Sequence, residues 1–432
     1  MTIERGILAR RQRLRCPEGT SDILPDDAAR RDEVESIAQR IFTAAGYRRI
    51  DTPAFESTEL FERGVGLSTD IVRKQMFKFN DDRGRSLTLR PEGTAAICRA
   101  YVQHGMQRLQ HPLRLWFHGA YYRQDVPQAG RFRQFWQVGV EVLGSDEPAI
   151  DAECMLLLTE LFQALEVPGV RLRLSSLGTA ENRARYREML ITHLRRNERD
   201  LSAEVRSRIG INPLRAFDSR HPGTQAVMTN APRLLDHLDT ADREHFSEVT
   251  ALLDAVGVSY DIDPTLVRGL DYYTRTVFEF SSDRLGAQNA VGGGGRFDDL
   301  VGELGGPPTA ACGGCAGVER VLLSIGERPV ARPRLDLYVA VANVAEQRNA
   351  LRVSAMARAL GLAAQPGSAR RSLRSQFRHA DGLGARYVAV LGTDRAWLKD
   401  MISGKQVQID AAELVPEVAH RLRNASSLDG GQ

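Results

Sequence analysis

The sequence contains no apolar run that approaches the roughly 18 residues needed to cross a membrane, so it predicts no membrane span. It also lacks a strong charge of one sign, because 58 Lys and Arg residues nearly balance 55 Asp and Glu residues, leaving a net charge of +3. Any nucleic-acid partner must therefore bind local basic patches. The Arg-rich residues 1–16 carry no hydrophobic secretion signal, and we expect a basic extension or a short organelle presequence there.

Cysteine is scarce, with five residues spread over the chain. An odd, dispersed set argues for reduced thiols and a cytoplasmic location. Two of them form the sequence CGGC, at Cys312 and Cys315. A zinc site would need a second such pair, and a thioredoxin-like site would need a helix that opens at Cys312. We expect instead two small residues in a tightly packed strand between glycines.

Several catalytic motifs are missing. HExxH, GxSxG and paired Cys/His metal spacings do not occur, which excludes the metalloprotease and serine-hydrolase classes that use them. The four glycines at 292–295 match neither a dinucleotide-binding fingerprint nor a phosphate-binding loop ending in Gly-Lys-Ser/Thr. They leave two interpretations, a flexible loop or a backbone that a ligand approaches closely.

The length of the chain suggests two or three domains. Helical, charged patterns between strand-like segments indicate an insertion into one sheet. A proline-containing linker precedes a part where strand and helix patterns alternate, as in a small α/β domain with a partly parallel sheet. The expected organisation is an extension 1–16, a core 17–325 with a helical insertion at about 178–258, a linker 326–334, a second domain 335–424 and a flexible tail 425–432.

The first part of the core alternates helix and strand patterns. Residues 28–47 have helical spacing, and the strand-like segment that follows is broken at Pro53. We expect a hairpin that turns at residues 81–84 and a helix that begins near Thr94. Two alternating strands should then follow, joined by a loop at 127–130.

These two strands carry polar side chains on one face. Period-two geometry puts Arg123 and Asp125 together on the first strand, and on the second it aligns Phe135, Gln137, Gly139 and Glu141. A guanidinium suits a phosphate, an aromatic ring could stack on a base, and the loop adds Arg131 and Arg133 as phosphate candidates. A solvated sheet face would show the same pattern. The glycine at 139 leaves either a gap for a ligand or a bulge.

Two further segments place polar residues at strand ends. In RPEGT, residues 90–94, Glu92 could accept a hydrogen bond from an ammonium group or cap the following helix. In LVRGLDYYTRTVFEF, residues 266–280, Arg268 and two tyrosines precede a strand that we expect to be half-buried. That strand entrance is either a solvated edge or the floor of a pocket for a polar, planar ligand.

Together these segments resemble the class II aminoacyl-tRNA synthetases, and specifically the histidyl-tRNA synthetases, over residues 17–424. The class II motifs appear in order, as a helix and strand ending at Pro53, a strand–loop–strand with Arg123 and Phe135, and the sequence GVER with Arg320. Each motif alone is common, whereas the ordered triplet is specific. The family's other signatures resemble LVRGLDYYTRTVFEF, GGGGRFDDLVGELGG, TLRPEGTA, GRFRQFWQVGVEVLG and NPLRAFDSRHP.

The resemblance implies an α+β fold: a class II core with an antiparallel sheet flanked by helices, a helical insertion, and a C-terminal α/β anticodon-binding domain. It implies a ligase that activates L-histidine with ATP to histidyl-adenylate and transfers it to the 3′ end of histidine tRNA. ATP would bind with Mg²⁺, without dedicated metal ligands from the protein. The enzyme would be a cytoplasmic homodimer that does not bind a membrane.

The resemblance also assigns residues to this reaction. Arg123 and Arg268 would be catalytic, because they could stabilise charge on the α-phosphate from opposite sides. The ATP-binding set would be Arg123, Arg131, Phe135 and Arg320, with the phenyl ring stacked on adenine. The histidine-binding set would be Glu92, Gly93, Thr94, Arg123, Gln137, Glu141, Arg268, Tyr272 and Tyr273. The tRNA-binding set, spaced to share one side of a helix in the second domain, would be Arg370, Arg371, Arg374 and Arg378.

The sequence departs from the family pattern in three places. Val126 stands where many bacterial relatives have an arginine near the tRNA acceptor end, which leaves the reading of that end open. Phe297 replaces the usual tyrosine, so one hydroxyl is missing near the expected pocket. Gly314 and Cys315 replace a bulkier pair in the third motif.

Two alternatives keep the fold without tRNA charging. One is a regulatory subunit of histidine biosynthesis, although such subunits lack the C-terminal domain and the signature arginines that this chain retains. The other is an enzyme that activates an amino acid for a different acceptor, for which the adenylation residues would look alike.

Overall fold

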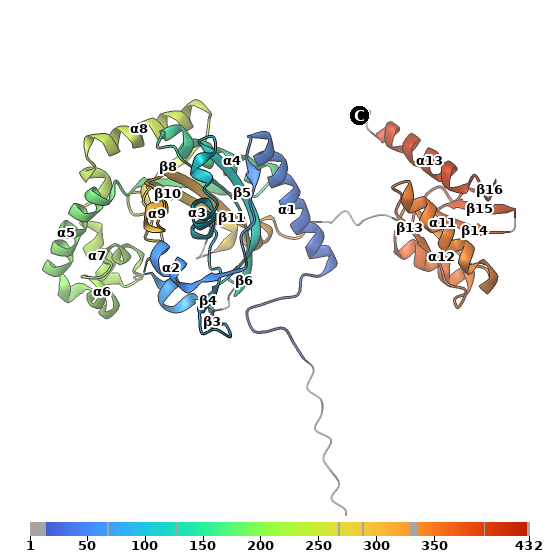
Figure 1. Ribbon diagram of the computed structural model, residues 1–432, viewed down its shortest axis with the longest axis horizontal. Coiled ribbons are helices and arrows are strands. Elements are labelled where there is room, and N and C mark those ends of the chain that lie inside the picture. Colours follow the sequence, from blue (N-terminus) through green and yellow to red (C-terminus); the bar gives the residue numbers. More distant parts are fainter. Residues whose placement is uncertain are drawn as a thin grey trace, which may run out of the picture. The chain divides into compact units, whose positions relative to one another are not determined.

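The computed structural model describes residues 14–66, 69–126, 128, 130–266, 268–286, 289–328, 335–392 and 394–429. The chain divides into two compact units, Met1–Val330 and Ala331–Gln432 (Figure 1). The division falls inside the segment 326–334 expected to be a linker. Residues 329–334 of that segment and 1–13 of the expected extension lie outside the described residues. No helix in the described ranges is long and apolar enough to span a membrane.

An eight-stranded sheet forms the centre of the first unit, in the order β1-β5-β6-β11-β10-β9-β7-β8. Neighbouring strands from β5 to β7 run antiparallel, and each edge strand pairs in parallel. The antiparallel sheet implied by the resemblance is therefore confirmed. The strands are β1 (Arg48–Arg49), β5 (Leu113–Tyr122), β6 (Gln134–Leu143), β7 (Val170–Ser176), β8 (Tyr260–Ile262), β9 (Thr274–Ser282), β10 (Ala290–Arg296) and β11 (Ala311–Gly317).

Alternating side chains give this sheet two different faces. On β6, Val138, Val140 and Val142 are buried in a hydrophobic cluster with residues of α1 (Pro25–Ala44) and α4 (Pro148–Ala164). The intervening Glu141 turns to the other face, where it meets the start of α3 (Thr94–Gln103). Its side chain is only 2% exposed, so the interpretation of this face as solvated is wrong.

The expected hairpin and helix are present on this second face. A three-stranded sheet joins β2 (Phe55–Ser57), β4 (Ser86–Leu89) and β3 (Lys78–Asn80), with the turn at 81–84 held by Asp81, which accepts hydrogen bonds from two backbone N–H groups. The helix α2 (Thr58–Gly64) packs against α3 and β4. The strand-like segment around Pro53 is split, since β1 belongs to the large sheet and β2 to the small one.

Only helices and turns lie between β7 and β8, within the range expected for the insertion. The helices are α5 (Ala180–Arg196), α6 (Ala203–Arg208), α7 (Pro222–Thr229) and α8 (Thr240–Ala255). Each begins with a side chain that accepts a hydrogen bond from a first-turn backbone N–H, at Thr179, Ser202, His221 and Asp239 respectively. Short polar caps therefore define the helices of this segment locally.

The strand after the tyrosine pair is more buried than expected. Between β10 and β7, β9 buries Val277 in one hydrophobic cluster and Phe278 and Phe280 in the other, so both faces are covered. The prediction of a half-buried strand was wrong because period two cannot distinguish a solvated face from one that another layer covers.

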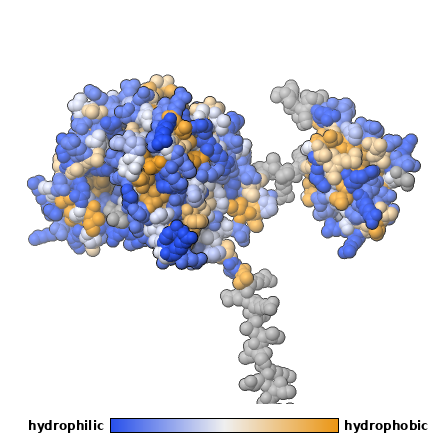
Figure 2. Space-filling model, viewed as in Figure 1, coloured by the Kyte–Doolittle hydropathy of each residue, from blue (hydrophilic) through white to orange (hydrophobic). Residues whose placement is uncertain are grey.

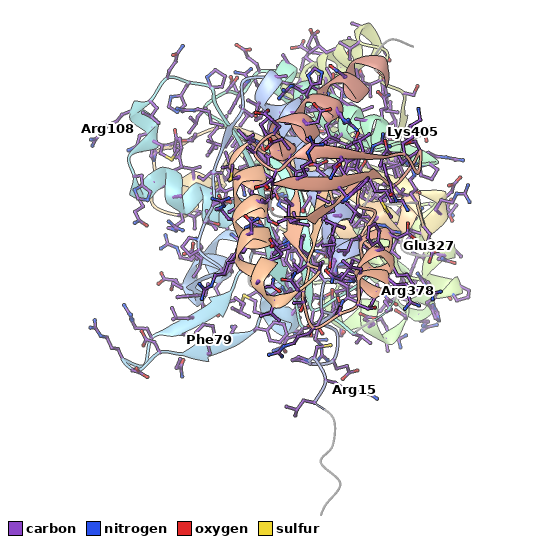
Figure 3. All side chains as sticks on the ribbon, turned by 90° about the vertical axis from the view of Figure 1, so that its right-hand side faces the viewer. Arg15, Phe79, Arg108, Glu327, Arg378 and Lys405 are labelled. Atoms are coloured by element: carbon purple, nitrogen blue, oxygen red, sulfur yellow. The ribbon has the colours of Figure 1, made fainter. Side chains whose placement is uncertain are left out.

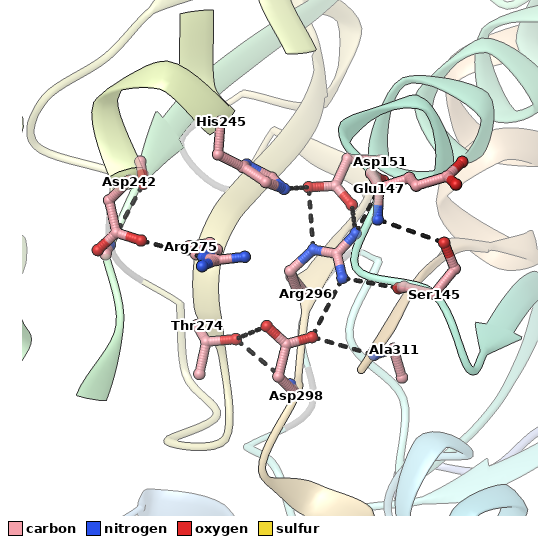
Figure 4. A network of polar contacts seen from close by, with 12 residues as sticks. Ser145, Glu147, Asp151, Asp242, His245, Thr274, Arg275, Arg296, Asp298 and Ala311 are labelled. Atoms are coloured by element: carbon pink, nitrogen blue, oxygen red, sulfur yellow. Dashed lines mark hydrogen bonds and ion pairs between the residues drawn. The ribbon is translucent and has the colours of Figure 1, made fainter. Parts of the chain in front are cut away.

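A buried polar network joins the ends of these strands to α4 (Figure 4). Arg296, at the end of β10, is fully buried and donates to both carboxylate oxygens of Asp151 and to the backbone oxygens of Ser145 and Glu147. It also bonds Asp298, which accepts from Ala311 at the start of β11. The same carboxylate accepts from the hydroxyl of Thr274 at the start of β9. One guanidinium thus links three strand ends with the beginning of α4.

The second unit is a small α/β domain with a partly parallel sheet, in the order β13-β12-β14-β15-β16. The first three strands pair in parallel and the last three antiparallel. The elements are β12 (Leu337–Ala340), α11 (Gln347–Ala359), β13 (Ala364–Pro366), α12 (Leu373–Gly382), β14 (Tyr387–Leu391), β15 (Arg395–Asp400), β16 (Gln406–Asp410) and α13 (Leu414–Asp429).

The backbone of α13 is helical to Asp429, so this helix extends into the segment 425–432 that was expected as a tail. Residues 430–432 lie outside the described residues. The visible face of both units is mostly hydrophilic, with apolar side chains gathered in small patches (Figure 2).

Substitution of Asp151 by alanine should destabilise the first unit by about 3–5 kcal/mol, because Arg296 would become a buried charge without its main partner. A matched control is Glu59→Ala, which removes an exposed partner of Arg63 and should cost about 1 kcal/mol or less. The measurement is the shift of the unfolding midpoint. Equal effects of the two substitutions would contradict the role given to the network.

Candidate active site

A cavity of about 340 Å³ opens on the polar face of the central sheet. Its size lies within the range typical of small-molecule sites. The structure brings together in its lining all twelve residues that the resemblance assigned to ATP and histidine in the core. These are Glu92, Gly93, Thr94, Arg123, Arg131, Phe135, Gln137, Glu141, Arg268, Tyr272, Tyr273 and Arg320.

Glu141 is a buried carboxyl group with only half of its hydrogen-bonding capacity used. The hydroxyl of Thr94 donates to its Oε1 at 2.6 Å, while Oε2 is buried and has no hydrogen-bond partner among the described residues. Burial raises the pKa of Glu141 to about 8, against the lowering effect of the Thr94 hydrogen bond. A ligand that offers an N–H to Oε2 would therefore satisfy a costly orphan acceptor.

Glu92 caps α3, one of the two interpretations that its sequence position left open. Its two oxygens accept from the backbone N–H groups of Thr94 and Ala95 at 2.8 and 2.9 Å, and the hydroxyl of Tyr272 donates to it at 3.3 Å. Burial nevertheless raises the pKa of Glu92, against these lowering contacts. Because the carboxylate also lines the cavity, capping does not prevent contact with an ammonium group.

Three aromatic rings form the wall beside these carboxylates. Tyr272 and Tyr273 have ring centroids 4.7 Å apart, and the ring of Phe297 lies 5.8 Å from that of Tyr272. All three are buried. The interpretation of the strand entrance as a solvated edge is therefore wrong. Because Phe297 lacks the hydroxyl that a tyrosine would have, its ring makes only an apolar contact with Tyr272.

Arginines gather elsewhere along the same cavity. Arg123 donates to the Pro91 carbonyl at 2.9 Å, and its guanidinium lies 5.1 Å from the Phe135 ring centroid. Burial lowers the pKa of Arg123, and it also lowers that of Arg320, whose pKa the nearby cations Arg131 and Arg123 lower further. Such a group of cations favours an anion with several charges.

Backbone carbonyls and carboxylates accept hydrogen bonds from these arginines and so fix the orientation of their side chains. Arg320 donates to the carbonyls of Gly130 and Ala290 at 3.0 and 2.6 Å. Arg268 bonds Glu279 on β9 at 2.7 Å, while its Nε is buried without a hydrogen-bond partner among the described residues. Arg131 is more loosely held, 3.8 Å from Asp125.

The glycine-rich segments are strands, so the flexible-loop interpretation is wrong. A Cβ at Gly313 would overlap Oε2 of Glu141, and one at Gly293 would lie 2.8 Å from the Arg268 guanidinium. The glycines thus leave space for these two side chains. The packed-strand interpretation of CGGC is confirmed, since β11 pairs on both sides and its cysteines are free. Gly139 marks neither a gap nor a bulge, because its register is regular and a Cβ would meet the Gly314 carbonyl.

An ion pair that was not predicted from the sequence holds one lining residue of the cavity, Glu319, in place. Arg31 on α1 bonds Glu319 at 2.9 Å, and Glu319 in turn accepts the backbone N–H of Trp136, between two lining residues of β6. In the sequence, only its position beside Arg320 in GVER indicated that Glu319 could lie near the site. Nothing in the sequence links it with a residue of the first helix.

The four arginines of the second unit that were predicted to bind tRNA do not share one helical face. Because α12 begins at Leu373, after the cap at Ser372, Arg370 and Arg371 lie in the preceding turn and only Arg374 and Arg378 are helical. The prediction of a single face was therefore wrong. All four are exposed; Arg378 is labelled in Figure 3. Trp397 on β15, which was not predicted, is 53% exposed, and an exposed indole ring is a surface on which a base can stack.

The unpaired Oε2 of Glu141 predicts how stability depends on pH. A folded-state pKa raised to about 8 means that the folded protein holds this proton through a window where the unfolded chain has released it. Stability should therefore fall as pH rises from about 5 to 8.

Glu141→Gln cannot titrate, so it should lose less stability over that window, by about 1–3 kcal/mol for a buried polar group of this kind. The measurement is the difference between the unfolding midpoints at pH 5 and pH 8 without ligands. Glu59→Gln, an exposed carboxylate, is the control. The same pH difference in wild type and Glu141→Gln would rule out the raised pKa.

Comparisons with known proteins agree with this geometry. The family model described as histidyl-tRNA synthetase matches residues 19–321. The histidine–tRNA ligase of Thermosynechococcus vestitus is 44% identical over 410 residues, which cover 94% of this chain and 96% of that protein. The corresponding ligase of Halorhodospira halophila is 46% identical and covers 87% and 89% of the two chains.

Solved structures give the same result. The apo histidyl-tRNA synthetase of Staphylococcus aureus matches with a TM-score of 0.79 and 32% identity, over 94% of this chain and all of that chain. A Bacillus halodurans protein described as an ATP phosphoribosyltransferase regulatory subunit/histidyl-tRNA synthetase matches at 23% identity with a TM-score of 0.63, which shows the fold alone. This chain therefore belongs to the histidyl-tRNA synthetase family.

Proposed function

We propose that this protein is a histidine–tRNA ligase, which activates L-histidine with ATP and transfers it to the 3′ end of histidine tRNA. The observation that carries the proposal is the unpaired Oε2 of Glu141, buried in a cavity that also holds a group of arginines. One part of the cavity fits a small N–H donor, and another fits a polyanion.

In this proposal the imidazole ring binds beside Glu141 and Tyr273, which can bond its two nitrogens. The α-amino group binds near Glu92, Thr94 and Gln137. A ligand that lacked these polar groups would leave buried acceptors unpaired, so a site of this kind discriminates by orders of magnitude. The cavity would thereby select histidine over apolar amino acids of similar size.

Attack of the histidine carboxylate on the α-phosphorus of ATP forms the carboxyl–phosphate bond and releases pyrophosphate. Negative charge builds on the non-bridging oxygens, where Arg123 and Arg268 would stabilise it. Arg131 and Arg320 would hold the outer phosphates, with Phe135 stacked on adenine.

Magnesium would enter this site with ATP. No three His, Cys, Asp or Glu residues within the described ranges lie together as a metal site. When bound, Mg²⁺ would neutralise part of the phosphate charge. The arginines named above bind and orient the nucleotide in either case.

We further propose a homodimer, the commonest oligomer in soluble proteins. The three-stranded sheet exposes Phe55 and Phe79, at 51% and 42%, with ring centroids 6.1 Å apart. Phe79 is labelled in Figure 3. Light scattering at micromolar concentration should give twice the mass of one chain. Phe55→Ser with Phe79→Ser should weaken the dimer, whereas a monomeric wild type would refute it. The cytoplasmic location stays a prediction.

Arg268→Ala should lower the rate of histidine-dependent ATP–pyrophosphate exchange by about 10²–10³-fold, while the KM for histidine changes much less. The reason is that its contact strengthens as charge develops on the α-phosphate. Arg173→Ala is a matched control, because Arg173 also bonds Glu279 but does not line the cavity. Equal loss of binding and rate would exclude the assigned role.

Deletion of residues 330–432 should leave much of histidine activation intact, because the two units are separately compact. Charging of histidine tRNA should fall by at least roughly tenfold, since phosphate contacts and anticodon stacking would be lost. Binding of tRNA by the full chain should be salt-dependent. If a folded, truncated protein charges tRNA like the full chain, the second unit has another role.

A further inference from the structure

A second cavity, of about 440 Å³, lies where the helical insertion meets the core. The insertion contributes Arg208, Arg215 and Arg220 to its lining. Two serines and an asparagine add neutral polar groups, at Ser202, Ser219 and Asn212. Its acidic lining residues are Glu204, which pairs with Arg208 at 3.4 Å, and Asp70 from the core. This composition is that of a site for an oxyanion.

Among the described residues, Asp70 is the only lining residue that the core supplies, and it is loosely held. Its two oxygens lie 3.8 Å from Arg208 and 3.4 Å from Arg215, longer than the roughly 2.7–2.9 Å of a good charge-assisted bond. Its side chain is 35% exposed. An ion pair of this kind adds little stability. An anion with more charge and more oxygens could therefore displace it.

The segment that follows Asp70 reaches the active-site cavity. Ile71 lines that cavity, and Gln75 donates to Asp125 at 2.8 Å. The carbonyl of Gln75 also accepts the backbone N–H of Gln124, next to Arg123. Residues 69–75 thus connect the insertion's arginines with the segment just after β5, which carries Arg123 and Asp125.

We propose that this arginine cavity is a binding site for a phosphate group, in which Asp70 is an internal competitor. Phosphate binding to Arg208 and Arg215 displaces Asp70 and loosens residues 69–75 beside the active site. The source is a backbone phosphate of the bound RNA or a free phosphate anion. The RNA source rests on the proposed function, because it requires tRNA as a substrate. The arrangement couples arrival of the anion at the insertion to the wall of the cavity.

The test measures binding and hydrogen exchange on the full chain. The probes are an RNA hairpin with the acceptor stem of histidine tRNA but no anticodon, and inorganic phosphate at the same ionic strength. Asp70→Asn should bind the hairpin about two- to fivefold more tightly, the worth of one exposed ion pair. Glu62→Gln is the matched control, with a similarly exposed carboxylate that pairs with Lys78.

Exchange of the amides at 69–76 should quicken when the hairpin or phosphate binds the wild type. In Asp70→Asn it should already be fast without a probe. Replacement of Arg208 and Arg215 by glutamine should weaken hairpin binding. It should also reduce, by about one to two, the steepness with which the logarithm of the affinity falls with the logarithm of the salt concentration. A response to phosphate alone assigns the site to free anions, and a response to the hairpin alone assigns it to RNA.

Unchanged exchange at 69–76 with both the hairpin and phosphate would overturn the proposal, as would equal affinity of the wild type and Asp70→Asn for the probe that produces the response. Histidine-dependent ATP–pyrophosphate exchange, measured on the same preparations, separates the two hypotheses. Its absence from the wild type would refute the proposed function. Its presence with unresponsive residues 69–76 would refute only the competition by Asp70.

Discussion

The buried guanidinium of Arg296 is the contact on which the first unit depends most. A charge with no exposure to water is tolerated only when its donors are satisfied, and Arg296 uses all three nitrogens on Asp151, Asp298 and two backbone carbonyls. These partners come from α4 and from the ends of the strands that carry the cavity walls. The pair Tyr272 and Tyr273, the glycine-rich strand β10 and the sequence GVER that contains Arg320 therefore keep fixed relative positions.

The cavity combines walls held by hydrogen bonds with buried polar atoms that have no hydrogen-bond partner among the described residues. In the cavity wall, Glu319 is held by the Arg31 guanidinium and by the backbone N–H of Trp136. Inside the cavity, Oε2 of Glu141 and Nε of Arg268 are buried without partners within the described residues. Unpaired buried polar atoms lower stability, and they are expected where a ligand completes the set. The cavity is thus preorganised, and part of its stabilisation is left to the substrates.

The arginines of both cavities pair with carboxylates of the protein and are proposed to bind phosphates. In the core, Glu279 and Asp125 hold Arg268 and Arg131 near the positions proposed for phosphates. At the insertion, Asp70 holds Arg208 and Arg215 as loosely as Asp125 holds Arg131, and more loosely than Glu279 holds Arg268. A carboxylate that loosely pairs an arginine keeps its position without a large desolvation cost. The same carboxylate is a weak competitor for a phosphate, so both cavities combine order with access.

The sequence by itself determined the strands β5 and β6, the hairpin turn at 81–84 and the helix at Thr94, because period-two alternation, turn residues and caps act over a few neighbours. Motif order, through resemblance, also indicated which residues would line the cavity. Only the tertiary structure decided that the polar face of β6 is buried and that β9 is covered on both sides. It alone placed Thr94 against Glu141 and Arg31 against Glu319. The start of α12 at Leu373 likewise separated Arg370 and Arg371 from the helix. The physical reason is that burial and long-range pairing depend on which layers pack together, and no local pattern encodes that.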